Sequence, residues 1–232
     1  MLSILIPVYN VKVKTLVNDL LAQAHQLNVT CELVLEDDAS TDAVVRAENA
    51  RLASADEVVY IQNEQNKGRS KVRNHLAQVA RYPYLIFMDC DANVCRPDYL
   101  SVYIQHIQSR SSSGKPFVVL GGLCYRETMP DEYCRLRWIY GRDREQKSAV
   151  QRNLSPYRSF TPFNMLISKS VFSNCQFDES LTTYGFEDTF FGEQLLEAGV
   201  EVQHLDNPLY HDGLDENEIF LHKVEFSYTL IR

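Results

Sequence analysis

The sequence predicts an α/β fold in which helices flank a mostly parallel sheet. Two observations carry this prediction: short apolar runs alternate with amphipathic stretches over about the first 120 residues, and three of the runs end in polar turns. Strands joined by helices of this length need right-handed crossovers, which place successive strands parallel in one sheet. At 232 residues, 45% of them hydrophobic, the chain is long enough for a single domain with a substantial core.

The apolar runs predict strands, and the segments whose apolar residues recur every three or four positions predict helices. In chain order, the predicted strands are 2–8, 32–35, 57–62, 84–88, 116–121, 160–167 and 200–205. The predicted helices are 13–27, a polar Ala-rich stretch after the second strand, 70–81, and a segment that starts near Glu187. Residues 126–158 show neither pattern, so we expect an irregular, mobile loop there.

Polar side chains follow three of the predicted strands where each strand ends. Asn10 follows the first strand, Asp37 and Asp38 follow the second, and Asp89 and Asp91 follow the fourth. In open parallel sheets, ligands bind beyond the carboxyl ends of the strands. The sequence therefore predicts a binding site along this edge.

The two acidic pairs have alternative interpretations. Asp89 and Asp91 are two positions apart, so both can face one divalent cation, although Asp is also common in solvated turns. Asp37 and Asp38 can accept hydrogen bonds from a nucleobase and a ribose, or, together with Ser40 and Asp42, they can be only the N-cap signal of the helix that follows.

Residues 66–74, with the sequence NKGRSKVRN, set four cations in seven residues around Gly68 at a helix start. Such a turn suits an anionic diphosphate, with Lys67 and Arg73 close to it. The alternatives are a solvated helix face, or cations that pair with the acidic strand ends.

Glu187 and Asp188 stand at the start of a predicted helix. One of these carboxylates can act as a general base, but acids in a first helical turn are also stabilised by the helix dipole alone. His211 is a candidate metal ligand, with a satisfied structural histidine as the alternative.

Five segments, in this order, resemble the motifs of the family 2 glycosyltransferases, whose A-type fold contains a Rossmann-like sheet. They are IPVYN at 6–10, EDDAST at 36–41, NKGRSKVRN at 66–74, FMDCDANV at 87–94 and YGFEDTFFGEQLLEAG at 184–199. The resemblance spans residues 3–215. It implies one domain, 1–232, in which 1–122 binds the nucleotide sugar and 123–232 binds the acceptor.

The resemblance implies an inverting transfer of a hexosyl or N-acetylhexosaminyl group from a nucleotide-diphosphate sugar, with UDP as the commonest nucleotide. The acceptor is a hydroxyl of a saccharide or lipid-linked saccharide, and the divalent metal is Mn²⁺ or Mg²⁺. Carried over by position, the nucleotide-sugar residues are Pro7, Tyr9, Asn10, Asp37, Asp38, Lys67, Gly68, Arg73 and Asp89. The implied metal ligands are Asp91 and His211, together with Asp89. The implied catalytic residues are Asp188, which acts as the base, and Glu187.

Two departures from the family pattern concern the acceptor side. Tyr184 stands where glycine is frequent and is expected to shape the acceptor pocket. The Q-x-x-R-W signature of processive synthases is absent after Glu187-Asp188, which favours transfer of single sugars.

The charge and the composition of the chain limit the classes of molecule that it is expected to bind. Thirty-one acidic against 23 basic residues give a net charge of -8, which argues against binding to nucleic acid. Six cysteines without a C-x-x-C pair predict buried, reduced thiols and a cytoplasmic location.

Residues 126–158 hold eight Lys/Arg against five Asp/Glu, which predicts contact with an anionic acceptor or peripheral contact with the inner membrane face. An internally paired loop is the alternative. No pattern predicts an oligomeric state.

Two other functions remain as alternatives. A nucleotidyltransferase normally has an N-terminal Gly-rich loop for the triphosphate, but residues 1–15 contain no glycine. A catalytically inactive sugar- or partner-binding domain of the same fold has no need of the intact acidic pairs at 89–91 and 187–188.

Overall fold

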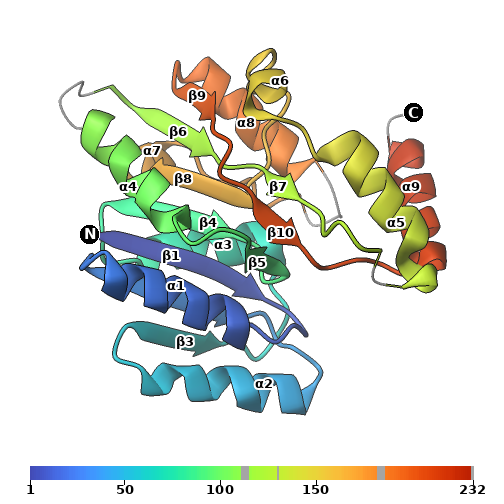
Figure 1. Cartoon of the computed structure of the whole chain (residues 1–232), viewed down its shortest axis with the longest axis horizontal. Helices are drawn as coiled ribbons and strands as arrows, with labels where there is room; N and C mark the ends of the chain where they lie inside the picture. The colour runs from blue at the N-terminus through green and yellow to red at the C-terminus, as the bar shows by residue number, and fades with distance from the viewer. Residues whose placement is uncertain (111–114, 130, 182–185, 231–232) are drawn as a thin grey trace.

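In the computed structural model, which describes residues 1–110, 115–129, 131–181 and 186–230, a seven-stranded sheet lies between layers of helices (Figure 1). The strands are β1 (Leu2–Val8), β2 (Cys31–Asp37), β3 (Val58–Gln62), β4 (Tyr84–Met88), β6 (Phe117–Leu120), β8 (Asn164–Ser168) and β9 (Glu201–His204). Their order is β3-β2-β1-β4-β8-β6-β9, and β8 alone runs antiparallel to its neighbours β4 and β6. The predicted α/β class with a mostly parallel sheet is confirmed.

Helices cover both faces of this sheet, so its central strands are apolar on both sides. The helices over the sheet are α1 (Lys14–Gln26), α2 (Ala43–Ala50), α3 (Arg69–Val79), α4 (Tyr99–Arg110) and α8 (Glu187–Glu197), with the short α7 (Lys169–Asn174) after β8. Ile4 of β1 packs in one core with Leu16 of α1, while Leu5 packs in the opposite core with Val72 of α3. This alternation explains why the first strand is a continuous apolar run.

A second sheet of three short strands was not predicted. It consists of β5 (Ala92–Val94), β10 (Leu209–His211) and β7 (Leu123–Cys124), with β10 in the middle. Strands of two or three residues are too short to show a period of two. The register pairs His211 with Ala92, which brings His211 next to Asp91.

The prediction of an irregular loop at 126–158 is wrong. This segment contains a 3₁₀ turn (Glu132–Cys134), α5 (Arg135–Tyr140), a π-helical turn (Gly141–Glu145) and α6 (Ala149–Asn153). Helices of five or six residues make fewer than two turns, so no apolar periodicity reveals them. One local signal was present: Ser148 and Gln151 form a capping box at the start of α6.

Other boundaries shift for similar reasons. The strand predicted at 160–167 begins only at Asn164, because Phe160 and Phe163 belong to the irregular approach to β8. The predictions also lacked α4, α7 and the C-terminal α9 (Asn217–Leu230). The strands at 2–8 and 84–88 match β1 and β4 in full.

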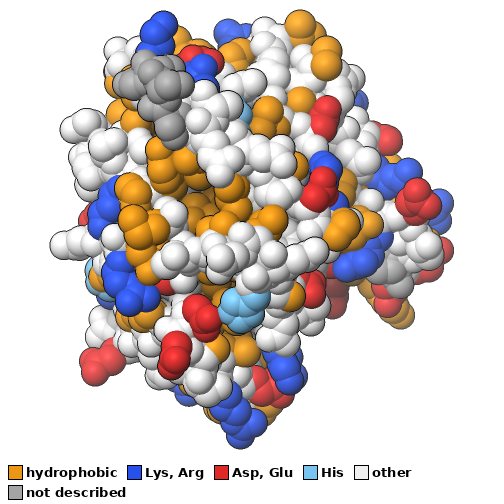
Figure 2. Space-filling view, turned by 60° about the vertical axis from the view of Figure 1, so that its left-hand side comes forward, with side chains coloured by type: hydrophobic (Ala, Val, Ile, Leu, Met, Phe, Trp, Pro, Cys, Tyr) orange, Lys and Arg blue, Asp and Glu red, His pale blue; other side chains and the backbone are white. Residues whose placement is uncertain are grey.

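All six cysteines are free thiols, but only Cys31 and Cys175 are buried. The expectation that the others are buried is wrong, since they lie in loops or at the ends of short elements, where they are half-buried. Among the described residues, no helix combines the length and the apolar character needed to cross a membrane. Figure 2 shows hydrophobic side chains gathered on one face, with charges of both signs spread around them.

Candidate active site

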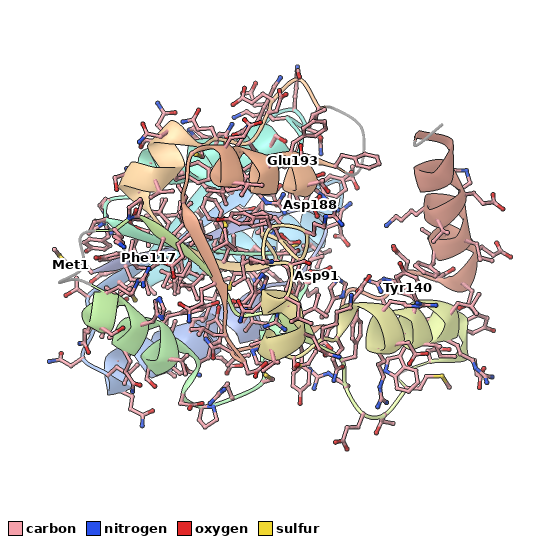
Figure 3. The ribbon with its side chains drawn as sticks, turned by 90° about the horizontal axis from the view of Figure 1, so that it is seen from above. Met1, Asp91, Phe117, Tyr140, Asp188 and Glu193 are labelled. Atoms are coloured by element: carbon pink, nitrogen blue, oxygen red, sulfur yellow. The ribbon has the colours of Figure 1, made fainter. Side chains whose placement is uncertain are left out.

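The candidate site lies where the strand order of the main sheet reverses. β1 pairs in parallel with both β2 and β4, so a crevice opens between the carboxyl ends of β1 and β4. Asp91 and Asp188 lie at this end, far from Met1 and Phe117 (Figure 3). This is the edge that the strand-end residues predicted.

Backbone strain gathers at the same edge. Asn10, Ala39 and Phe186 have φ angles of 55°, 60° and 70°, which are rare for residues other than glycine. They follow β1, follow β2 and precede α8, respectively. Strained residues persist where the surrounding structure fixes them, and such places are often functional.

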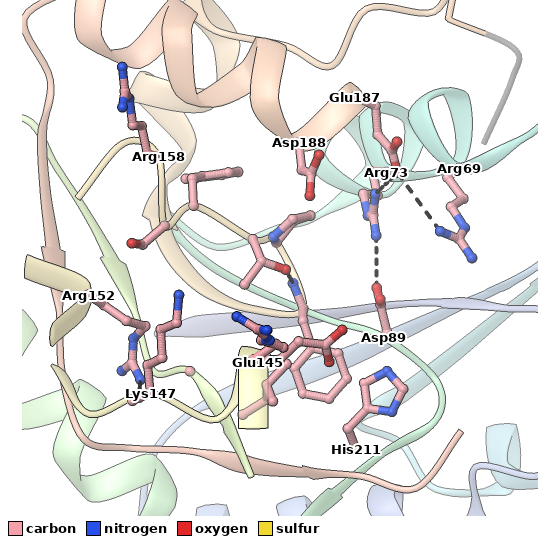
Figure 4. Close-up of a pocket in the computed structure, with 18 residues that line it drawn as sticks. Arg69, Arg73, Asp89, Glu145, Lys147, Arg152, Arg158, Glu187, Asp188 and His211 are labelled. Carbon is pink, nitrogen blue, oxygen red and sulfur yellow. Dashed lines mark hydrogen bonds and ion pairs between the residues drawn. The ribbon is translucent and has the colours of Figure 1, made fainter. Parts of the chain in front are cut away.

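Two cavities adjoin at this edge, and both are lined in part by Arg69, Arg73 and Asp89. The first, of about 340 Å³, lies against the end of β1 and is called the β1 pocket. The second, of about 400 Å³, lies at the start of α8 and is called the α8 pocket (Figure 4). The arrangement suits two reacting molecules that meet at the shared wall.

Most of the residues predicted to bind the nucleotide sugar line the β1 pocket. These are Pro7, Tyr9, Asp38, Gly68, Arg73 and Asp89, together with Asp91. Asn10, Asp37 and Lys67 lie beside the pocket, because their side chains hold the surrounding loops. The Asn10 amide contacts Thr41, Asp37 accepts hydrogen bonds from Ser40 N (2.7 Å) and Tyr60 Oη (3.0 Å), and the Lys67 ammonium lies 3.6 Å from Glu36.

Asp38 fixes the turn that starts α3. Its carboxylate accepts hydrogen bonds from the backbone N–H groups of Lys67 (2.7 Å) and Gly68 (2.9 Å). Gly68 has φ = 86°, a conformation that glycine adopts without strain. The alternative of a helix N-cap signal in this segment holds for Asp42, which caps α2 through Val44 N and Val45 N, but not for Asp37 or Asp38.

Arg73 connects the two pockets. Its guanidinium is 3% exposed and lies 2.9 Å from Asp89 and 3.5 Å from Glu187, with its flat face over Phe177. Burial alone would raise the pKa of Asp89, but the neighbouring Arg73 and Arg69 charges hold it below the usual value. Arg73 therefore pairs with acidic residues. This is the alternative in which cations of residues 66–74 pair with the acidic strand ends.

Arg73→Met is expected to lower the free energy of unfolding by about 3 kcal/mol, because it leaves Glu187 and Asp89 without their shared cation. Urea unfolding at pH 7 measures the change. The control is Arg69→Met, whose side chain is 56% exposed and 4.0 Å from Glu187, and which we expect to cost less than about 1 kcal/mol. Equal losses in the two variants would contradict a central role for Arg73.

Asp91 and His211 each have an unsatisfied polar atom. Asp91 Oδ1 and His211 Nδ1 are buried and lack a hydrogen-bond partner among the described residues. The imidazole is stacked between Tyr125 and Phe163, at centroid distances of 5.6 and 5.1 Å. Burial raises the pKa of Asp91, and the Asp89 charge adds to this effect.

The chain after β10 passes close to Asp91. A Cβ at Gly213 would lie 2.0 Å from Asp91 Oδ2, so only glycine leaves room for the carboxylate in its present position. Asp212 N donates to the Asp91 carbonyl at 3.0 Å, which fixes the two segments together.

Asp91 and His211 offer two atoms that can bind a divalent cation, but the described residues do not offer a complete set of ligands. No group of three His, Cys, Asp or Glu side chains in the described ranges is arranged to hold a metal ion. The unsatisfied atoms of Asp91 and His211 are a carboxylate oxygen and an imidazole nitrogen, both of which Mn²⁺ accepts. Asp89 already uses Oδ1 for Arg73, so it is a weaker candidate for this role.

Glu187 and Asp188 differ in their surroundings. Glu187 is buried and faces Arg73 and Arg69, whereas Asp188 is half-buried and accepts a hydrogen bond from Thr189 N at 2.8 Å. Burial raises the pKa of Asp188, and the neighbouring Glu187 charge raises it further. Asp188 is thus the better placed of the two to accept a proton. Tyr184 lies outside the described residues.

The sequence did not single out several residues of the α8 pocket. Four of them come from the basic segment 126–158: Arg144, Lys147, Arg152 and Arg158. The excess of positive charge in this segment was the available signal. Other cations of the segment are paired: Arg137 lies 3.0 Å from Glu145 within the segment, and Arg126 lies 2.6 Å from Asp212 outside it. The internally paired alternative therefore holds for only part of it.

Comparison with solved structures identifies the fold. The crystal structure of TarS 1-349 from S. aureus matches with a TM-score of 0.61 and 18% identity, and its complex with UDP matches with 0.64 and 20%. The complex with UDP-GlcNAc gives 0.64 and 18%. These matches cover 90% of this chain and 57–59% of the TarS chains, so the chain spans less than two thirds of those proteins.

The search among curated proteins found no significant match. A family model, described as glycosyl transferase family 2, matches residues 3–175. This match covers well over half of the chain, and the shared fold agrees with it. The predicted resemblance and the predicted enzyme class are therefore confirmed: the chain belongs to glycosyl transferase family 2.

Proposed function

We propose that this protein transfers single sugars from a UDP-sugar to an acceptor hydroxyl, with inversion at the anomeric carbon and with a divalent metal. The observation that carries the proposal is the junction of the two pockets at Arg73 and Asp89. A donor in the β1 pocket can direct its sugar toward Asp188 in the α8 pocket. Because the matched TarS structures include complexes with UDP and UDP-GlcNAc, UDP-N-acetylhexosamines are the first donors to test.

The β1 pocket has the chemistry that a nucleotide needs. Tyr9 and Pro7 give it an apolar wall for a base, and the Tyr9 side chain is 45% exposed there. Asp38 adds acceptor oxygens for base or ribose groups, although both already accept hydrogen bonds from the turn at Gly68. Arg69 and Arg73 add positive charge where the pocket meets its neighbour.

Asp91 and His211 are the residues that would hold the metal. A bound Mn²⁺ or Mg²⁺ would stabilise the negative charge that develops on the departing diphosphate. The protein itself supplies Arg73 and Arg69 near the same place. These charges are fixed before the reaction, so little reorganisation is needed.

Asp188 takes the proton in this mechanism. The acceptor oxygen attacks the anomeric carbon from the face opposite to UDP, the bond to UDP breaks, and the hydroxyl proton passes to the Asp188 carboxylate. A single displacement of this kind inverts the anomeric centre. Glu187 is less suited to accept the proton, because Arg73 and Arg69 stabilise its charged form.

Transfer should be pH-dependent because the base must be ionised. The pKa of Asp188 is raised above the ordinary value of about 3.9, so activity is expected to fall on acidification at a higher pH than an unperturbed aspartate would give. Rates of UDP release from UDP-GlcNAc between pH 4 and 8 give the profile, and circular dichroism at each pH verifies folding. A rate that stays constant down to pH 4 contradicts the assignment.

A donor screen tests the function as a whole. UDP release from a panel of UDP-sugars is measured with MnCl₂ and with EDTA, and NMR of the product gives its anomeric configuration. We expect release with at least one donor, dependence on the metal, and inversion. Pyrophosphate release from UTP and a sugar 1-phosphate would instead indicate a nucleotidyltransferase, and binding without turnover would indicate an inactive binding domain.

A further inference from the structure

The α8 pocket is positively charged in an acidic protein. Six Lys/Arg side chains and four Asp/Glu side chains line it, whereas the whole chain carries a net charge of -8. Arg73 pairs with both Asp89 and Glu187, so these charges balance within the lining. Glu145 pairs with Arg137, which lies outside the lining, and this raises the excess of positive charge in the pocket from two to three.

Four cations line the pocket besides Arg69 and Arg73, and three of them lie on one side of it. Figure 4 shows Lys147, Arg152 and Arg158 on the side of Asp188 that faces away from Arg73 and Asp89. In the described part of the chain, no carboxylate lies within 4.0 Å of the charged groups of these three residues. They are therefore separated from the wall shared with the β1 pocket, and a diphosphate bound there does not need them.

Arg152 is an unusual member of this group because it is 6% exposed. Its guanidinium donates to the carbonyl oxygens of Lys147, Gly121 (3.1 Å) and Leu205 (2.6 Å) and to His204 Nδ1 (3.1 Å). These partners are neutral, and the more distant Asp206 carboxylate compensates the buried charge only in part, because burial still lowers the pKa of Arg152 below its ordinary value. A buried charge normally has a counter-ion, and the pocket is the open space beside this one.

Lys147 and Arg158 complete the arrangement. Both side chains are exposed and line the pocket. Lys147 precedes α6 (Ala149–Asn153) and Arg158 follows it, and Figure 4 shows Lys147 next to Arg152 with Arg158 farther along the same side of the pocket. A group bound on this side would meet exposed cationic side chains beside one fixed, buried cation.

We propose that the acceptor carries an anionic group, a phosphate or a carboxylate, that binds between Lys147 and Arg158 over the buried charge of Arg152. This inference rests on the proposed function, since it uses the α8 pocket as the acceptor pocket. The anionic group positions the accepting hydroxyl beside Asp188. A cavity of about 400 Å³ favours such a compact group over a flat lipid surface.

Three matched probes test the proposal: methyl β-glucoside, methyl β-glucuronide and methyl β-glucoside 6-phosphate. Their binding is measured by NMR titration with UDP and MnCl₂ present. At least one anionic probe is expected to bind about 10-fold more tightly than the neutral one, the size of effect that charge-assisted hydrogen bonds give. The stronger anionic probe distinguishes a carboxylate from a phosphate. If neither anionic probe binds more tightly, the proposal is wrong.

Variants assign the effect to the named side chains. Lys147→Gln combined with Arg158→Gln is expected to reduce the preference for the anionic probe to about 2-fold or less. The matched control is Arg142→Gln in the same segment, an exposed arginine that stacks on Trp138 outside the pocket and should leave the preference unchanged. An equal loss in the control, or none in the double variant, overturns the assignment.

UDP release from UDP-sugars, measured without acceptor, separates this inference from the proposed function. If the double variant and the unaltered protein both release UDP but show no preference for anionic probes, only the inference fails. If the unaltered protein releases UDP from no donor, the proposed function fails. Binding to phosphatidylglycerol vesicles that disappears in the double variant, with no preference among the glycosides, would place these cations at a membrane and overturn the proposal.

Discussion

Asp91→Ala is expected to weaken UDP binding about 100-fold in the presence of Mn²⁺ and to remove most of the dependence on the metal. The β1 pocket presents Asp38, Asp89 and Asp91, of which Asp89 is paired with Arg73. A diphosphate placed beside these carboxylates is repelled unless a cation lies between them. Titration of UDP by calorimetry, with MnCl₂ and with EDTA, measures the effect.

Two further variants sharpen this result. His211→Ala is expected to weaken binding less, about 10-fold, since water can take the vacated ligand position. Asp56→Ala is the control, because Asp56 is an exposed acid just before β3, at the end of the parallel strands opposite to the pocket, and should leave UDP affinity unchanged. If Asp91→Ala keeps both the affinity and its Mn²⁺ dependence, the assignment of Asp91 as the metal ligand is wrong.

The main sheet could be predicted because its strands are long and apolar on both faces. β4, and β1 apart from Ser3, are apolar runs bounded by polar turns, and such runs can be recognised without knowledge of distant partners. The direction of β8 could not be predicted in the same way. An antiparallel strand and a parallel strand bury the same residue types, and only the pairing with β4 and β6 shows which one is present.

The site residues that could be predicted are those that directly follow a strand of the parallel sheet. Asp38, Asp89 and Asp91 lie in the pocket because they follow parallel strands at the reversal of strand order. The role of Arg73 depends on Glu187, 114 positions later, and no local pattern links residues so far apart. The environment of Arg152 could not be predicted for the same reason, since three of its four partners come from two distant segments, at Gly121 and at His204-Leu205.

Asp188→Asn is expected to lower turnover by about 10²–10⁴-fold, the usual contribution of a positioned general base. The asparagine keeps the size of the side chain and can still accept the hydrogen bond from Thr189 N. UDP and metal affinities should therefore change little, because they depend on the β1 pocket. Initial rates of sugar transfer, or of UDP release where water is the acceptor, measure the loss, and calorimetry with UDP verifies the unchanged binding.

Glu187→Gln is the matched variant, and it should retain measurably more turnover than Asp188→Asn. Neighbouring residues on a helix point about 100° apart, so the two carboxylates cannot both face the same hydroxyl. Glu187 points toward Arg73 and Arg69, and a glutamine there still offers an oxygen to Arg73. If Glu187→Gln is instead the more damaged variant, the base is Glu187, and Arg73 must release it during the reaction. If both variants keep nearly full activity, neither carboxylate is the base, and the proton must pass to water or to another group of the acceptor.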